Sequence, residues 1–205
     1  MNKFIELSKN LNTVFSENAE YLCKLDCEAG DGDHGLTISR GFKSAYEEIK
    51  KLDSNVSDKE VVKSIGYAML GSMGGASGPI FSTLFIQMAI TLNNEQLNVK
   101  TFKDSVINTI HAINEMANTN RGEKTMVDAL YGAVDELEKY NGNDLVEAMN
   151  VAQQGALNGA NATINMKATK GRAKFLQERS IGFMDAGSYS IYLIFKTIYE
   201  TWKNN

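Results

Sequence analysis

Proline is almost absent from this chain, with Pro79 the only one among 205 residues. Because proline breaks helix interiors and marks linkers, its scarcity lets most of the sequence be helical and argues against a proline-rich linker. No low-complexity tract or clear internal repeat divides the sequence either. The length suits one domain with a sizeable core, and we expect residues 1–205 to form a single domain.

Cysteine and surplus positive charge are scarce as well. The two cysteines, Cys23 and Cys27, are expected to be free thiols, and two thiols alone make a poor metal site. The net charge of −4 argues against direct binding of nucleic acid. A bound anion would therefore need local help from metal ions or from the N-termini of helices.

Long apolar segments are missing too. The polar N-terminal stretch MNKFIELSKN lacks the apolar core of a signal peptide, and no apolar run reaches the roughly 18 residues of a membrane span. We therefore expect a cytoplasmic protein that has no membrane partner.

What the sequence has in abundance is helical periodicity. Phe4, Leu7 and Leu11 share one face of a first helix, and the stretch 57–60 (SDKE) is the capping-box pattern that opens a third. Residues 191–195 also suit a buried strand, but no other segment offers a clear partner strand, so we predict a helix there. We predict eight helices in an antiparallel bundle or barrel, at about residues 2–24, 35–51, 57–71, 79–93, from 101, from 125, 143–167 and 187–203.

Four of the predicted connections have unusual compositions, namely residues 26–35, 71–78, 118–126 and 168–187. They follow the first, third, fifth and seventh predicted helices. In an up-and-down bundle, alternate connections lie at the same end, so these four should meet. We therefore expect the functional site at that end of the bundle.

The first of these loops contains the sequence GDGDHG at residues 30–35 and follows Asp26 closely. Carboxylates suit hard cations such as Mg²⁺, and the glycines let the chain turn Asp31 and Asp33 toward one point. Three carboxylates can hold two Mg²⁺ ions about 3.5–4 Å apart. The glycine spacing also matches a dinucleotide-binding turn, but no strand precedes it and the aspartates would repel phosphate. An EF-hand fails on its register, and a solvated acidic loop without function remains an alternative.

The other three loops suit a phosphate ester. Residues 74–78 lead into a helix whose first N–H groups can bind phosphate, unless this segment is only a flexible or tightly packed glycine turn. They lack the lysine of a Walker A loop. The guanidinium of Arg172 suits phosphate. Thr125 is expected to cap a helix, and Asp185 either caps the last helix or bonds a ligand sugar or base. His34 either contacts the ligand or is incidental to it.

Taken together, these motifs resemble those of the L subunits (DhaL) of bacterial phosphotransferase-system-dependent dihydroxyacetone kinases. The resemblance runs through nearly the whole chain, and the set of motifs is far more specific than any single one. The matching residues, in the family's order, are Asp26-x4-Asp31-x-Asp33-His34-Gly35, Gly74-Gly75-Ala76-Ser77-Gly78, Lys124-Thr125-Met126, Gly171-Arg172-Ala173, Glu178-Arg179-Ser180-Ile181-Gly182 and Asp185-x-Gly187.

The resemblance implies a barrel of eight antiparallel amphipathic helices that binds ADP or ATP at one end through two Mg²⁺ ions. By the motif match, the metal ligands are Asp26, Asp31 and Asp33. The family commonly has asparagine where this chain has Thr37 and proline where it has Ala186, and both departures fall on contacts to the adenine or ribose. The implied nucleotide-binding residues are His34, Gly35, Leu36, Thr37, Ala76, Ser77, Gly78, Thr125, Met126, Arg172, Asp185, Ala186 and Gly187.

The resemblance also implies phosphoryl transfer without a covalent nucleophile on this chain. A phosphohistidine M subunit would recharge ADP to ATP, and the γ-phosphate would pass to dihydroxyacetone held on a separate K subunit, giving dihydroxyacetone phosphate. The alternatives are a kinase subunit for another ketose or polyol, phosphorylation from free ATP, and a nucleotide-loaded adaptor of a transcription factor. The sequence also leaves open whether the protein forms a homodimer.

Overall fold

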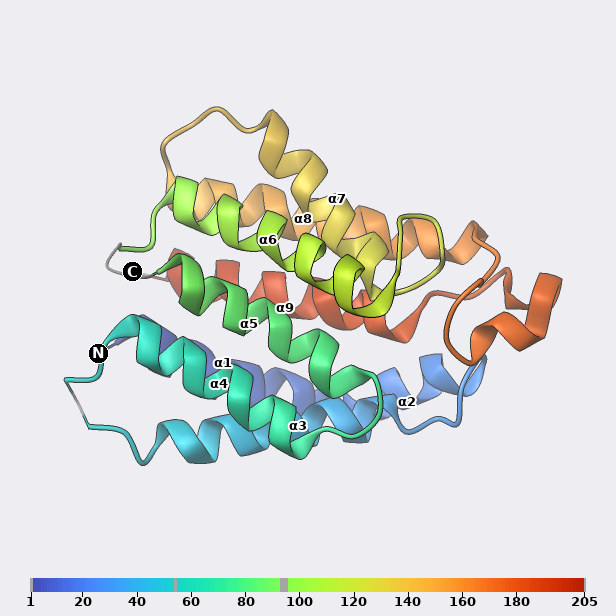
Figure 1. Ribbon diagram of the computed structural model, residues 1–205, viewed down its shortest axis with the longest axis horizontal. Helices are drawn as coiled ribbons and strands as arrows, with labels where there is room; N and C mark the ends of the chain where they lie inside the picture. The colour runs from blue at the N-terminus through green and yellow to red at the C-terminus, as the bar shows by residue number, and fades with distance from the viewer. Residues whose placement is uncertain (1, 54, 93–95, 205) are drawn as a thin grey trace.

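The computed structural model describes residues 2–53, 55–92 and 96–204. Within these ranges every regular element is a helix, which confirms the predicted all-α class (Figure 1). The elements are α1 (Lys3–Glu17), α2 (Ala19–Cys27), α3 (His34–Ile49), α4 (Asp58–Ser72), α5 (Ser77–Thr91), α6 (Val99–Ala117), α7 (Met126–Lys139), α8 (Leu145–Ala162), the 3₁₀ helices η1 (Thr163–Asn165) and η2 (Ala173–Ser180), and α9 (Ala186–Lys203).

The long helices form a closed ring around one core. From α3 onward each long helix packs against the next along the chain, α9 packs back against α1, and α2 continues α1 beside α3 (Figure 1). If α1 and α2 are counted as one position, the ring has eight positions in the described part of the chain. Stacked and edge-to-face aromatic pairs fill the interior, such as Phe15 on Phe42 with ring centroids 4.4 Å apart. The helical barrel predicted from the sequence is consistent with this arrangement.

The first predicted helix is divided at Asn18. Instead of one helix over residues 2–24, the structure has α1 and α2, and Asn18 lies between them with φ −96° and ψ 2°. The Asn18 side-chain amide donates to the carbonyl of Val14 at 2.7 Å, beside the backbone N–H of Asn18, which donates to the same carbonyl at 3.0 Å. The chain therefore bends there, and α2 extends far enough to include Asp26.

Other helix ends differ from the prediction for local reasons. The Ser57 hydroxyl accepts the N–H of Glu60 at 3.3 Å, as its cap pattern predicts. However, α5 begins at Ser77, two residues before Pro79, because proline is tolerated anywhere in a first turn, where its missing N–H has no partner to lose. The predicted end of this helix at Asn93 lies outside the described residues. Helix α8 ends at Ala162, and residues 163–165 tighten into a 3₁₀ turn. The ambiguous segment 191–195 lies inside α9 and is helical, as predicted.

Small residues let α7 and α8 touch through their backbones. A Cβ placed on Gly155 would lie 2.2 Å from the carbonyl oxygen of Gly132, and one on Gly159 would lie 2.4 Å from that of Asp128. The close approach agrees with the composition of α8, which is rich in small residues. These are Ala148, Ala152, Gly155, Ala156, Gly159 and Ala160.

We expect Gly155→Ala to lower the unfolding free energy by about 1–3 kcal/mol, because the new methyl group must push the two helices apart. The matched control is Gly71→Ala in α4, where a Cβ meets nothing within 4 Å, and where the better helix propensity of alanine should add up to about 1 kcal/mol. Urea unfolding of both variants measures the difference. Equal effects at the two positions would contradict the close packing of α7 on α8.

The two ends of the ring differ in character. The start of α1, the ends of α3, α5, α7 and α9, and the starts of α4, α6 and α8 lie at one end (Figure 1). The α2–α3, α4–α5 and α6–α7 connections and the segment before α9 lie at the other end (Figure 1). These last four are the loops of unusual composition. Among the described residues, no helix has both the length and the apolarity that crossing a membrane requires.

Candidate nucleotide and metal site

The four unusual loops together line one cavity of about 580 Å³. Its volume lies within the usual range for sites that take a ligand of nucleotide size. The lining residues come from segments 26–40, 74–80, 117–127, 170–173 and 185–187. The expectation that alternate connections meet at one end is therefore confirmed by the geometry.

Three carboxylates converge on one side of this cavity. Oxygen atoms of Asp26, Asp31 and Asp33 all lie within 4.8 Å of one another. Asp26, on α2, also accepts the backbone N–H groups of Asp33 at 3.1 Å and His34 at 3.3 Å, which fixes the start of α3. An all-carboxylate donor set fits Mg²⁺, and it does not fit soft metals that prefer thiolate or imidazole.

Glycines shape the chain around these carboxylates. A Cβ on Gly30 would lie 2.3 Å from an oxygen of Asp26, so a larger residue would displace that carboxylate. Gly32 has φ +74°, a left-handed conformation that favours glycine. The loop therefore needs glycine at both positions to bring Asp31 and Asp33 back toward Asp26.

Arg172 reaches across the cavity mouth and forms an ion pair with Asp31. This hydrogen bond is the main cause that holds the pKa of Asp31 below its usual value. The pKa of Arg172 is raised in turn, first by Asp31 and further by Asp33 and Asp26. A guanidinium therefore lies where all three negative charges act on it.

The glycine loop before α5 forms another wall. Gly75 has φ +64°, and a Cβ on Gly74 or Gly75 would meet nothing within 4 Å, so this turn is not tightly packed. Ala76, at the N-cap of α5, offers no side-chain hydrogen bond to the first turn. The N-terminal N–H groups of α5 and its helix dipole therefore favour an anion in the cavity.

The starts of α7 and α9 form the remaining wall. Thr125 caps α7 by accepting the N–H of Val127 at 3.3 Å, as predicted. Asp185 caps α9 by accepting the N–H of Ser188 at 2.7 Å, which settles its local role without excluding a contact to a ligand. Burial raises the pKa of Asp185 to about 6, and the bonds from Ser188 and the charge of Lys124 oppose that rise only in part.

His34 joins α3 to α9 beside the acidic cluster. Its Nε2 lies 2.8 Å from the hydroxyl oxygen of Ser190, and that hydroxyl donates to the carbonyl of Ala186 at 3.0 Å. Because the Ser190 proton is already used, Nε2–H is the donor to Ser190. Burial lowers the pKa of His34, and the charges of Asp26 and Asp33 oppose that effect. His34 thus has a packing role in addition to lining the cavity.

Comparisons with known proteins agree with this geometry. The DAK2 domain model matches residues 28–200. The ADP-binding subunit DhaL of PEP-dependent dihydroxyacetone kinase 1 from Listeria innocua is 34% identical over 189 residues, which cover 90% of this chain and 88% of the relative. The corresponding subunit from Escherichia coli is 35% identical over 191 residues, 90% and 89% of the two chains.

The chain belongs to the DhaL family of DAK2-domain proteins. Two crystal structures of the dihydroxyacetone kinase of C. freundii share its fold. The native form has a TM-score of 0.73 at 21% identity, and the complex with AMP-PNP and Mg²⁺ has 0.70 at 23%. Each covers 96% of the present chain, which spans only about a third of the longer kinase (34% and 33%).

Most nucleotide-binding residues predicted from the DhaL motifs line the cavity, but three do not. A Cβ on Gly35 would lie 1.9 Å from the carbonyl oxygen of Ala19, so this glycine lets α3 approach α2. A Cβ on Gly78 would lie 2.7 Å from the carbonyl oxygen of Met73. Leu36 is exposed. The residues that do line it are His34, Thr37, Ala76, Ser77, Thr125, Met126, Arg172, Asp185, Ala186 and Gly187, together with the three aspartates.

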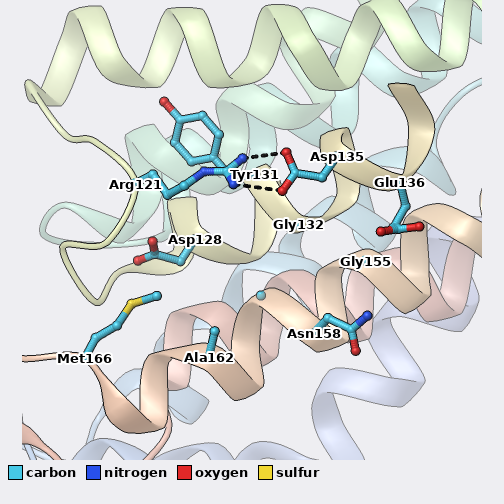
Figure 2. Close-up of a pocket in the computed structure, with 11 residues that line it drawn as sticks. Arg121, Asp128, Tyr131, Gly132, Asp135, Glu136, Gly155, Asn158, Ala162 and Met166 are labelled. Carbon is cyan, nitrogen blue, oxygen red and sulfur yellow. Dashed lines mark hydrogen bonds and ion pairs between the residues drawn. The ribbon is translucent and has the colours of Figure 1, made fainter. Parts of the chain in front are cut away.

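A second cavity lies between α7 and α8 and holds none of the predicted site residues (Figure 2). It measures about 230 Å³, too small for a nucleotide. Arg121 donates to both carboxylate oxygens of Asp135 at 2.8 and 2.6 Å and covers the ring of Tyr131 at 4.6 Å (Figure 2). These contacts of Arg121 fasten the 118–125 loop to α7.

Asp185 makes the stability of this DhaL-family chain depend on pH. Its pKa is about 6 in the folded state against 3.8 in an exposed carboxyl, so the folded state binds the proton more tightly. Its favourable contribution is therefore complete below about pH 4 and is lost as the pH rises through about 6. Asp185→Asn keeps a capping oxygen and removes the charge.

We expect the unfolding free energy of Asp185→Asn, relative to the unaltered chain, to rise by about 2 kcal/mol between about pH 4.5 and pH 7.5. Urea unfolding at several pH values in EDTA, without nucleotide, measures this difference. A stability difference that stays constant across the range would show that the Asp185 carboxylate is not penalised by burial.

Proposed function

We propose that residues 1–205 form a single nucleotide-binding domain that acts as the nucleotide-holding subunit of a split dihydroxyacetone kinase. The observation that carries this proposal is the meeting of an acidic triad and an open glycine turn at one cavity of nucleotide size. The similarity to relatives named as ADP-binding subunits supports the same reading.

The metal ligands in this proposal are Asp26, Asp31 and Asp33. Their separations are compatible with two Mg²⁺ ions that share a carboxylate, in the manner of other two-metal sites. Metal held there would supply positive charge that neutralises the phosphates of the nucleotide. The chain's own part is to hold the three carboxylates at one point through Gly30 and Gly32.

The remaining walls would bind the rest of the nucleotide. The first turn of α5, with Ala76 and Ser77, supplies N–H groups to a phosphate oxygen. Arg172, once released from Asp31, supplies a guanidinium to the transferring phosphoryl group. The wall formed by the starts of α7 and α9 takes the ribose and base, together with Thr37 on the neighbouring α3. Thr37 and Ala186 stand where the family commonly has asparagine and proline.

The proposed reaction consists of two phosphoryl transfers. A phosphohistidine on an M subunit gives its phosphoryl group to bound ADP, which restores free histidine and forms ATP. The γ-phosphate then passes to a hydroxyl oxygen of dihydroxyacetone held on a K subunit, and that hydroxyl loses its proton as dihydroxyacetone phosphate and ADP form. No side chain of this chain is required as a covalent carrier.

A phosphotransfer assay tests this function. The protein, loaded with radiolabelled ATP and Mg²⁺ and freed of excess nucleotide, is mixed with a family K subunit and dihydroxyacetone. We expect stoichiometric transfer of label to dihydroxyacetone and conversion of bound ATP to ADP. Retained nucleotide without transfer to this or another ketose or polyol would contradict the kinase function and favour a nucleotide-loaded adaptor.

A further inference from the structure

The most unusual basic residue of the chain is Lys124. It is the only lysine or arginine that is fully buried in the described part of the chain, with 3% of its surface exposed. Its backbone has φ +59°, a left-handed conformation that is costly for a lysine. Such strain and such burial of charge persist where the surrounding structure requires them, and they cluster at functional sites.

The ammonium of Lys124 is bound by backbone carbonyls. Nζ donates to the oxygen of Thr163 at 2.5 Å and to that of Phe183 at 2.5 Å, and it lies 4.6 Å from the centre of the Phe183 ring. No carboxylate among the described residues lies within ion-pair distance of it. Burial lowers the pKa of Lys124, and the charge of Asp185 opposes that effect.

These bonds join the parts of the chain that form one wall of the cavity. Lys124 directly precedes Thr125 and Met126, and Phe183 lies two residues before Asp185. The Asp185 N–H donates to the Thr163 hydroxyl at 3.0 Å. The Ser188 hydroxyl donates to the Thr125 carbonyl at 2.7 Å, which closes the ring of contacts between the starts of α7 and α9.

The bonds of the Lys124 network run between Lys124, Thr163, Phe183, Thr125, Asp185 and Ser188, and none of these bonds is made to Asp26, Asp31 or Asp33. The start of α9 also meets α3 through the bond between His34 and Ser190, and that contact does not involve Lys124. The Lys124 network therefore acts on the starts of α7 and α9 rather than on the three carboxylates.

We propose that Lys124 is a positioning residue for the nucleoside half of the site: its buried ammonium, helped by the Ser188 hydroxyl, holds Thr125–Met126 and Asp185–Gly187 where they contact the ribose and base. The inference rests on the proposed function. It assigns the network to recognition of the nucleoside, and it predicts that binding of the phosphates alone does not need Lys124.

Titration calorimetry with two probes tests this division, using Mg²⁺ with ADP and Mg²⁺ with inorganic pyrophosphate. We expect Lys124→Met to weaken ADP binding by about tenfold or more while pyrophosphate affinity stays within about twofold. Ser188→Ala, a milder change, should weaken ADP binding about threefold with pyrophosphate unaffected. The control Lys139→Met removes an exposed lysine at the far end of α7 and should alter neither affinity.

Equal losses of ADP and pyrophosphate affinity in Lys124→Met would mean that Lys124 has a general structural role, and they would overturn the inference. Unchanged ADP affinity in folded Lys124→Met would overturn it as well. If Lys124→Met fails to fold, Ser188→Ala decides alone, and an unaltered ADP affinity there overturns the proposal. A wild-type protein that binds pyrophosphate and ADP equally contradicts the nucleoside wall, whereas one that binds neither overturns the proposed function itself.

Discussion

Asp31→Asn is expected to abolish Mg²⁺-dependent binding of ADP, a loss of about 100-fold or more in affinity. Asparagine keeps the shape of the side chain and one oxygen but removes the negative charge that a hard cation requires. Because Asp31 lies about half exposed at the cavity mouth and its ion pair with Arg172 is a surface contact, the fold should remain intact. Titration calorimetry of ADP with and without Mg²⁺ measures the effect.

The matched control is Glu28→Gln, in the same loop but outside the acidic cluster. It removes the same charge and should leave ADP affinity within about twofold. Circular dichroism and thermal unfolding establish that both variants are folded. An unchanged ADP affinity in Asp31→Asn would remove the basis for metal-mediated binding at this loop.

Arg172→Gln should have two effects of opposite sign. Without nucleotide, the guanidinium occupies the field of the three carboxylates that we propose as metal ligands, so it competes with the incoming cation. Its removal should tighten Mn²⁺ binding about two- to fivefold, the range expected for loss of an exposed ion pair. With ATP bound, loss of a charged donor to the transferring phosphoryl group should slow phosphotransfer about 10²–10³-fold.

Electron paramagnetic resonance of Mn²⁺ and the phosphotransfer assay measure the two effects separately. Lys174→Gln is the control, because Lys174 is a cation of the same loop that lies over the Phe175 ring and outside the cavity lining. We expect it to change neither quantity greatly. If Arg172→Gln weakens Mn²⁺ binding, the guanidinium supports the metal site rather than competing for it.

The sequence was sufficient to predict that the four unusual loops meet at one end, because the positions of the loops follow from helix order alone. Alternate connections of an up-and-down bundle share one end, and the acidic, glycine-rich and basic loops are all alternate connections. The acidic cluster could be predicted equally well, since Asp26, Asp31 and Asp33 are close in sequence and glycines separate them. Local signals also identified the caps at Ser57 and Thr125.

What the sequence could not give were features that depend on contacts between distant segments. The bend at Asn18 is a local exception, because its side chain bonds Val14 only four residues earlier, yet no sequence pattern predicted it. Gly35 matches the motif, yet its position is set by the carbonyl of Ala19 in the neighbouring helix. The motif match named Lys124 but not its burial, which only the carbonyls of Thr163 and Phe183, some 40 and 60 residues away, reveal. The positive φ at Lys124 has no compositional signal, since glycine or asparagine would mark such a position.

Native mass spectrometry tests the central claim most directly. The protein is incubated with ADP and Mg²⁺, desalted into a volatile buffer and weighed intact. The account predicts a main species whose added mass equals one ADP and two Mg²⁺ ions, and its conversion to the bare chain when EDTA is added first. A protein that retains ADP after chelation, or that binds neither ADP nor Mg²⁺, would contradict nucleotide binding through metal ions on Asp26, Asp31 and Asp33.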